Sequence, residues 1–375
     1  MAQGGADPAR DGVADYTAHL VEELRRTGEQ VEPVRVVGSP AGVARAARRI
    51  RALGPELVHV QFAPSAFGFS PWPGLLPDLV GAPVVTTVHE YGWWAAPSWV
   101  PDRVWRPLER RGIDRETWRL VPRSAAVLTT NAGHEETLRE RMRIAPVLAP
   151  LAPNVADLGP APREETRRRL GVPADAEVVA FFGFVHPVKG VRYLAEAAAR
   201  LRAEGRDRLH VLVVGGFTSL ALPEDEAQAF RTELLGQIAA AGVAAHLTVT
   251  GHLPEKEVSA ALHAADLAAF PLTAGVTTKS GALLSAFAHG LPTVVTRADP
   301  PDPELVDGES AVVVPRVRDG AALAEALRRL LDDPALRLRV AAGGEAVGAA
   351  RSWERIAALH REVYSDVRAG VCGRA

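Results

Sequence analysis

A run of hydroxyl and charged residues stands at the start of a predicted apolar helix in the second half of the chain. The run consists of Thr277, Thr278, Lys279, Ser280 and Gly281. The N–H groups and the positive dipole end at a helix start favour an anion, and glycine allows an anion to approach closely. The hydroxyls and the lysine add donors and charge. The pattern predicts an anion site that suits a diphosphate, and the alternative is an ordinary N-cap with a solvated lysine.

Lysine is rare in this chain, which makes each lysine informative. Of 43 basic residues only Lys189, Lys256 and Lys279 are lysines, and the others are arginines. A lysine supplies a compact point charge that the planar guanidinium of arginine does not. Lys189 lies in FFGFVHPVKG, between the glycine turn at Gly183 and the start of a predicted helix. Unless both are chance surface residues, Lys189 and Lys279 predict one nucleotide-diphosphate site.

Several glycines and a histidine stand at the ends of predicted strands or at the start of a helix. In open α/β sheets, ligands bind beyond the carboxyl ends of the strands. The residues at such positions are Gly12, His89, Glu90, Gly183, Gly215, Gly216 and Gly251. We therefore expect His89 to lie near a reacting group, and the alternative is a buried histidine that the backbone satisfies.

Strands and helices alternate along the chain. Strands are predicted at residues 31–37, 56–62, 82–90, 125–131, 178–184, 210–216, 247–251, 267–271, 292–296 and 311–315. Helices are predicted at about 16–26, 41–53, 190–203, 224–241, 255–264, 279–289, 320–331 and 353–367. Such alternation is typical of a parallel, doubly wound α/β sheet. It restarts after the proline-rich segment 145–165, which predicts a hinge between two Rossmann-like units.

The hinge divides the chain into predicted domains. Residues 1–155 form the first, residues 156–352 form the second, and residues 353–375 form a helix that packs back on the first. A doubly wound domain normally begins with a strand, whereas this chain opens on a polar, glycine-rich segment. The first strand is therefore expected to be missing, lost at the start of the sequence.

The composition narrows the classes of protein that fit. The chain has 375 residues, of which 47% are hydrophobic and 23% charged, as in a soluble protein of two or three domains. A formal net charge of −2 predicts no nucleic-acid partner. The single cysteine excludes a disulfide framework, and no metal-ligand cluster is evident, so no metal is expected. No membrane span or signal peptide is evident. A cytoplasmic location is expected, with peripheral contact to the inner face of the membrane as an alternative.

The order of the motifs resembles the retaining glycosyltransferases of family 4, which have the GT-B fold. The matching segments are DGVADYTAHLVEEL, VVTTVHE, FFGFVHPVKGVRYLAEA, VLVVGG, TGHLPEKEVSAALHAADLAAFPL, LLSAFAHGLPTVV and PELVDGESAVVVP. The resemblance covers residues 10–365 and implies two Rossmann-like doubly wound domains facing a central cleft. It places the acceptor on the side of the first domain and a nucleotide-sugar donor in the second.

The resemblance also implies roles for individual residues. Lys189 would neutralise the leaving diphosphate, and His89 would lie near the sugar. Lys279 is expected to join them in catalysis because of its own position at the predicted helix start. The expected donor contacts are Gly12, Gly183, Lys189, Gly215, Gly251, Thr277, Thr278, Lys279, Ser280, Gly281, Ser285 and Glu304. The chain departs from the family pattern at two places. Phe184 replaces an arginine, and the two glutamates of the family fall on Thr277 and Ser285.

The predicted function is transfer of a sugar from a nucleotide-diphosphate sugar to a glycan, lipid or small-molecule acceptor, with retention and without a cofactor. One alternative is a non-catalytic sugar-nucleotide-binding relative, which the replaced glutamates favour. The other is an epimerase on the same fold. An epimerase needs paired carboxylates, for which Glu90 and Glu304 are the candidates.

Overall fold

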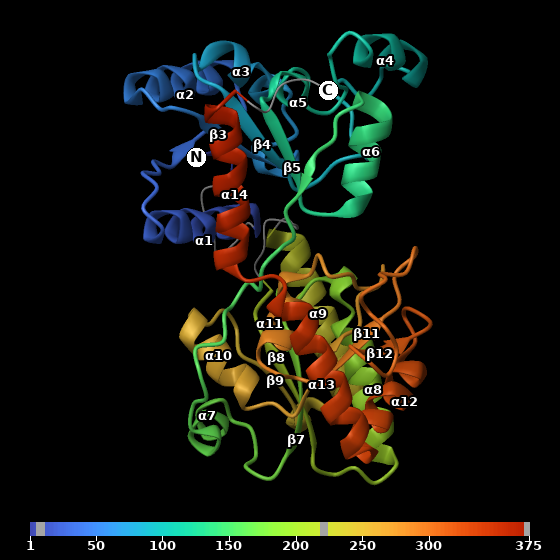
Figure 1. Ribbon diagram of the computed structural model, residues 1–375. Helices are drawn as coiled ribbons and strands as arrows, with labels where there is room; N and C mark the ends of the chain where they lie inside the picture. The colour runs from blue at the N-terminus through green and yellow to red at the C-terminus, as the bar shows by residue number, and fades with distance from the viewer. Residues whose placement is uncertain (5–11, 218–223, 371–375) are drawn as a thin grey trace. The chain divides into compact units, whose positions relative to one another are not determined.

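The protein consists of two compact α/β units. The computed structural model describes residues 1–4, 12–217 and 224–370. The first unit is Met1–Pro150 with Trp353–Ala375, and the second is Leu151–Ser352. Each unit alternates strands with helices around one six-stranded sheet (Figure 1). All strand pairs are parallel, which confirms the predicted fold class of two doubly wound sheets.

The sheet of the first unit has the order β2-β1-β3-β4-β5-β6. Its strands are β1 (Ala2–Gln3), β2 (Val34–Arg35), β3 (Val58–Phe62), β4 (Val84–Val88), β5 (Ala126–Thr129) and β6 (Val147–Leu148). The expectation of a missing first strand is wrong, because β1 pairs with both β2 and β3. A strand of two residues shows no alternation, so the sequence pattern could not reveal it. The strand β6 lies inside the proline-rich segment that was predicted to be a hinge.

Helices connect the strands of the first unit. They are α1 (Gly12–Arg26), α2 (Pro40–Leu53), α3 (Leu76–Leu79), α4 (Asp102–Glu109), α5 (Leu120–Arg123), α6 (Ala132–Met142) and α14 (Trp353–Arg368). Local signals set their ends. Ser39 caps α2 by accepting from the N–H of Gly42, and Gly54 ends it in the left-handed region. The last helix, α14, packs against α1 (Figure 1).

The sheet of the second unit has the order β12-β11-β10-β7-β8-β9. Its strands are β7 (Glu177–Phe182), β8 (Leu209–Val214), β9 (Leu247–Val249), β10 (Leu267–Phe270), β11 (Thr293–Thr296) and β12 (Val312–Val314). The chain builds outward from β7 on one side through β9 and then returns to place β10 on the other side. The pair β7/β10 is therefore the topological switch point, where open α/β sheets bind ligands.

Helices of the second unit carry its apolar core. They are α7 (Arg163–Arg169), α8 (Val191–Ala203), α9 (Glu224–Ala240), α10 (Glu255–His263), α11 (Gly281–Ala288), α12 (Gly320–Asp332) and α13 (Pro334–Ala349). The helix α12 packs against α8, and α11 packs against α13. The strands β8 and β10 are buried along their whole length, as expected for a parallel sheet covered on both faces. The helix α13 was not predicted.

Candidate functional site

The predicted diphosphate site falls at the switch point of the second unit. Gly183 follows β7, and the segment that leads into α11 follows β10. A Cβ added to Gly183 would lie 4.0 Å from the Cβ of Ala282 in the first turn of α11. Two segments that lie far apart in sequence therefore meet at one edge of the sheet, where the strand-end rule places a ligand.

The other strand-end glycines of the second unit lie along the same edge. The N–H of Gly183 donates to the carbonyl of Val214 at 3.0 Å, and the N–H of Gly215 donates to Oγ1 of Thr250 at 3.1 Å. Gly215 and Gly251 form an isolated bridge. A Cβ at Gly215 would lie 2.1 Å from the carbonyl oxygen of Gly183, so only glycine fits there.

Lys189 ends a short 3-10 turn at this edge. The turn, Pro187–Lys189, is followed by Gly190 in the left-handed region, and then by α8. A Cβ at Gly190 would lie 1.9 Å from the carbonyl oxygen of Pro271, so the turn packs directly on the end of β10. Lys189 is partly buried, and burial lowers the pKa of its ammonium group. Within the described part of the chain, that group has no carboxylate partner.

The start of α11 is already partly capped by the protein itself. The hydroxyl of Ser280 accepts from the N–H of Leu283 at 3.2 Å, as a normal N-cap does. Both the N–H and the hydroxyl of Thr278 donate to Oδ2 of Asp302, at 2.7 and 2.9 Å. A carboxylate therefore occupies one donor pair of the predicted anion site. The N–H groups of Gly281 and the residue after it have no intrahelical carbonyl partner.

Thr277, Lys279 and Glu304 are three further predicted contacts on this unit. Thr277 accepts from the N–H of exposed Lys279 at 3.4 Å. Glu304 forms an ion pair with Arg351 and accepts from the hydroxyl of Thr278 at 3.3 Å. These three predicted residues thus lie around the start of α11.

Ser285 is the predicted contact that the structure does not bring to this group. It is fully buried, its hydroxyl donates to the carbonyl of Gly281 at 2.8 Å, and it accepts from the N–H of Val155 at 2.9 Å. Ser285 therefore ties the segment after β6 to α11. Asn154 adds to this tie, because its N–H donates to the carbonyl of Gly281 at 3.1 Å.

His89 lies in the first unit, directly after β4, and its ring is held by a buried polar row. Its Nε2–H donates to Oε1 of Gln61 at 2.7 Å. The amide of Gln61 in turn donates to Nε2 of His59 at 3.3 Å, and His59 Nδ1 donates to the hydroxyl of Tyr364 on α14 at 2.6 Å. The Oε1 atom of Gln61 can only accept a hydrogen bond, so the ring proton of His89 lies on Nε2. Nδ1 of His89 is therefore left as an acceptor.

Burial keeps His89, His59 and the neighbouring His360 neutral; the ring centroid of His360, on α14, lies 5.4 Å from that of His59. Desolvation lowers the pKa of His89 to about 3 and that of His360 to about 4, and it lowers the pKa of His59 well below its ordinary value. His89 therefore acts as a hydrogen-bond acceptor rather than as a cation near neutral pH. Sequence reasoning missed Gln61, although its spacing of two residues from His59 places both on one face of β3.

Gly12 is the predicted contact at the amino end of the first unit. It is the first residue of α1 and is exposed. The glycine-rich turn before it, residues 5–11, lies outside the described residues. The structure thus describes the helix that begins at Gly12 and not the turn that was expected to precede it.

Comparison with known proteins shows what this chain resembles. Residues 176–333 match the sequence model of the family Glycosyl transferases group 1. This match lies within the second unit, and the chain as a whole has the GT-B fold. Among solved structures, sucrose-phosphate synthase from Thermosynechococcus elongatus has a TM-score of 0.69 at 20% identity, covering 95% of this chain and 93% of that one. Anabaena HepE in complex with UDP-glucose has a TM-score of 0.70 at 17% identity, covering 96% and 97%.

Curated relatives of this GT-B chain are glycosyltransferases. A D-inositol 3-phosphate glycosyltransferase of Nocardioides sp. is 33% identical over 228 residues, which cover 57% of this chain and 48% of that protein. The alpha-D-kanosaminyltransferase of Streptomyces kanamyceticus is 28% identical over 342 residues, covering 87% and 82%. The chain spans about half the length of the first curated relatives it matches. The resemblance to glycosyltransferases is thus confirmed. None of the described helices is long and apolar enough to cross a membrane.

Proposed function

We propose that this chain is a glycosyltransferase that moves a sugar from a nucleotide-diphosphate sugar to an acceptor. The observation that carries the proposal is Lys189, whose partly buried ammonium group lies at the switch point without a carboxylate partner among the described residues. A partly desolvated cation is stabilised by an anion at the same site. The structural relative HepE was solved with UDP and with UDP-glucose, so a uridine diphosphate sugar is the donor that we propose first.

The residues at the switch point suit the departure of a diphosphate. Breaking the bond between the sugar and the phosphate oxygen develops negative charge on the leaving group. Lys189 and the N–H groups at the start of α11 would stabilise that charge more in the transition state than in the ground state. The reaction as proposed retains the configuration of the sugar, as the resemblance to the retaining family implies. It uses no cofactor, because these groups of the chain supply the charge stabilisation.

Exposed aromatic side chains in the first unit suit the acceptor. Phe69, in the loop after β3, lies 5.9 Å from Trp93 and 6.0 Å from Trp94 between ring centroids. Phe69 and Trp93 are exposed by 48% and 59%. Broad apolar ring faces with a polar edge suit a glycan or another small molecule with an apolar face. We propose this surface as the acceptor side and expect Trp93→Ala to raise KM for the acceptor while KM for the donor stays unchanged.

A screen of donors tests the proposed function. The full chain is incubated with UDP-, GDP-, ADP- and dTDP-sugars, and release of the nucleoside diphosphate is measured with and without candidate acceptors. We expect one donor class to be consumed, and Lys189→Ala to abolish most of that turnover. Lys256→Ala is the matched control, because it removes an exposed lysine of α10 outside the switch point.

The same screen separates the alternatives. Tight UDP binding without consumption of any donor would identify a non-catalytic binding protein. Conversion of the donor into its epimer without release of the nucleoside diphosphate would identify an epimerase. Either result contradicts the proposed transfer.

A further inference from the structure

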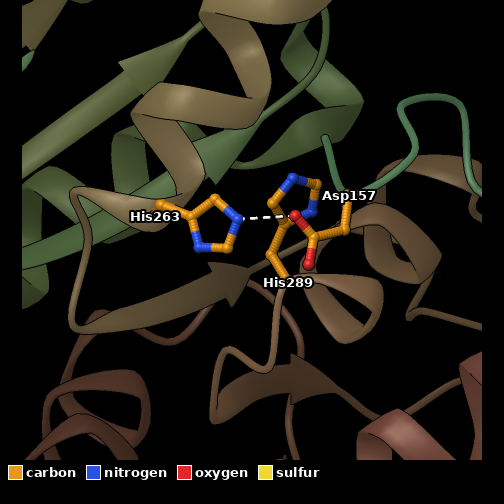
Figure 2. Close-up of side chains that lie close together, drawn as sticks. All are labelled: Asp157, His263 and His289. Atoms are coloured by element: carbon orange, nitrogen blue, oxygen red, sulfur yellow. Dashed lines mark hydrogen bonds and ion pairs between the residues drawn. The ribbon is translucent and has the colours of Figure 1, made fainter. Parts of the chain in front are cut away.

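Three side chains with metal-binding atoms converge in the second unit (Figure 2). Asp157 lies between β6 and α7, His263 is the last residue of α10, and His289 directly follows α11. One ligand atom from each lies within 4.8 Å of the other two. Nε2 of His263 lies 2.6 Å from Oδ1 of Asp157, and the two imidazole centroids are 4.9 Å apart.

His289 is oriented as a metal ligand would be. Its Nδ1–H donates to the carbonyl of Ser285 at 2.7 Å, so Nε2 carries the lone pair. Metal-binding histidines usually make this second hydrogen bond, because it fixes the tautomer and the ring orientation. Nε2 accepts from the hydroxyl of Ser259 at 2.8 Å, and that hydroxyl also accepts from the N–H of Leu158 at 3.1 Å. Ser259 therefore stays anchored if its hydroxyl proton turns away from Nε2.

The cluster is enclosed on one side and open on the other. The side chains of Asp157 and His263 are exposed by 40% and 19%, while His289 is exposed by 7%. An ion can thus reach the three ligand atoms from solvent. Because His263 precedes β10 and His289 precedes β11, the cluster lies at the amino-terminal edge of the sheet. Lys189 and Gly183 lie at the opposite, carboxyl-terminal edge.

We propose that Asp157, His263 and His289 bind a divalent transition-metal ion of the Zn²⁺ class. Two imidazole nitrogens and one carboxylate are typical Zn²⁺ ligands, whereas Mg²⁺ and Ca²⁺ prefer oxygen ligands throughout. On binding, the ring proton of His263 moves from Nε2 to Nδ1, and Nε2 and the Asp157 carboxylate bind the ion in place of their hydrogen bond. A water molecule completes the coordination. Bound there, the ion ties the segment before α7 to the carboxyl ends of α10 and α11, and so stabilises the second unit rather than taking part in sugar transfer.

Titration of the metal-stripped full chain with Zn²⁺ tests this site. We expect calorimetry near pH 7.5 to show one tight ion per chain, Mg²⁺ and Ca²⁺ to give no such signal, and Zn²⁺ to raise the Tm. Co²⁺ in place of Zn²⁺ should give the visible absorption of a tetrahedral site with nitrogen and oxygen ligands. Absence of tight Zn²⁺ binding by the folded chain would overturn the proposal.

Variants decide whether the ion binds at this cluster. Asp157→Asn and His263→Ala remove the two more exposed ligands, and each should weaken Zn²⁺ binding at least about tenfold and remove the Tm rise. His246→Ala is the control, because it removes another partly buried histidine of the same unit and should leave the affinity unchanged. Equal Zn²⁺ affinity in both cluster variants and in the unaltered chain would assign the ion to another place and refute the site.

Discussion

Lys189 and Lys279 differ in how far water surrounds them. Lys189 is partly buried at the end of its turn, whereas Lys279 is exposed at the start of α11. A charge in a less polar environment interacts more strongly with a developing anion. We therefore expect Lys189→Ala to lower kcat on the order of 10²–10³ and Lys279→Ala to lower it much less. Steady-state kinetics with the preferred donor will measure both, with Lys256→Ala as the control. Equal losses at the two positions would contradict the ranking by burial.

Replacing Lys189 with arginine tests the same chemistry. Lys189→Arg keeps the charge but replaces a compact ammonium group with a planar fork, so we expect only partial recovery of kcat. The affinity for UDP, measured by calorimetry, should change less than kcat in all these variants. A lysine that acted only in ground-state binding would instead change the affinity and kcat/KM together.

Gln61 sets the state of His89. Its Oε1 accepts from His89 at 2.7 Å, and its amide donates to His59. Gln61→Met removes both bonds at nearly constant volume, so His89 should lose its single tautomer. Long-range ¹⁵N–¹H NMR of the imidazoles, which distinguishes the two tautomers, should show one form in the unaltered chain and a mixture in the variant. Gln237→Met on α9 is the control. An unchanged His89 signal in Gln61→Met would mean that Gln61 does not position it.

At the scale of elements, the first turn of α11 depends on a close approach by Asn154. A Cβ at Gly281 would lie 1.7 Å from Oδ1 of Asn154 and 3.3 Å from the carbonyl oxygen of Ala152. Gly281→Ala therefore forces the Asn154 side chain to turn away and presses on the backbone of the segment after β6. We expect a loss of about 1–3 kcal/mol in the free energy of unfolding. Urea denaturation measures it, and Asn154→Gly in the same chain should recover part of the loss.

Gly236 is a matched glycine at which we expect alanine to stabilise the fold. Gly236 lies inside α9, and nothing stands within 4 Å of a Cβ built on it. Gly236→Ala should therefore raise the free energy of unfolding by about 0.5–1 kcal/mol. If Gly281→Ala behaves like Gly236→Ala, the close packing of Asn154 on α11 is not real.

The carboxylate of Asp302 competes for the start of α11. It accepts from both the N–H and the hydroxyl of Thr278 and places negative charge beside the predicted diphosphate. Asp302→Asn removes that charge, so we expect UDP to bind several-fold more tightly in calorimetry at low salt. Glu309→Gln, a change of the same charge at an exposed position nearby in sequence, should leave the affinity unchanged. Weaker UDP binding in Asp302→Asn would show that Asp302 supports the site instead.

At the scale of the whole molecule, buried histidines make the fold sensitive to acid. The pKa of His89 is lowered to about 3, and those of His210 and His360 to about 4. Between these values and about 6.5, the unfolded chain binds more protons than the folded chain, so stability falls as the pH falls through this window. Thermal unfolding from pH 7.5 to 4 should therefore show a steadily falling Tm.

His360 offers a test of that cause. Its Nε2 is buried and has no hydrogen-bond partner among the described residues, and its Nδ1–H donates to the carbonyl of Ile356, one turn earlier in α14. His360→Leu therefore removes one titrating group, and the Ile356 carbonyl keeps its helical N–H partner. The variant should lose less Tm than the unaltered chain between pH 6.5 and 4. An identical fall in Tm would show that His360 does not carry the acid sensitivity.

The sequence by itself determined the alternation of strands and helices and the candidates at the strand ends. Apolar periodicity is local, so it predicted β3, β4, β7, β8 and β10 close to their observed positions. The strand-end rule then assigned Gly183, Lys189 and the start of α11 to one edge of the sheet, because in a parallel sheet all carboxyl ends share an edge. The short strand β1 escaped this reasoning, because two residues carry no period.

The tertiary structure alone decided which polar groups meet. Asp157 and His263 are 106 residues apart in sequence and yet share a hydrogen bond, and Thr278 meets Asp302 through a turn that no periodic pattern marks. Ser285 illustrates the same limit. Its place in the family pattern favoured a ligand contact, but in the folded chain its hydroxyl accepts from the N–H of Val155. The physical reason is that burial of apolar side chains follows a short repeat along the chain. Polar contacts between distant segments depend instead on how whole elements pack.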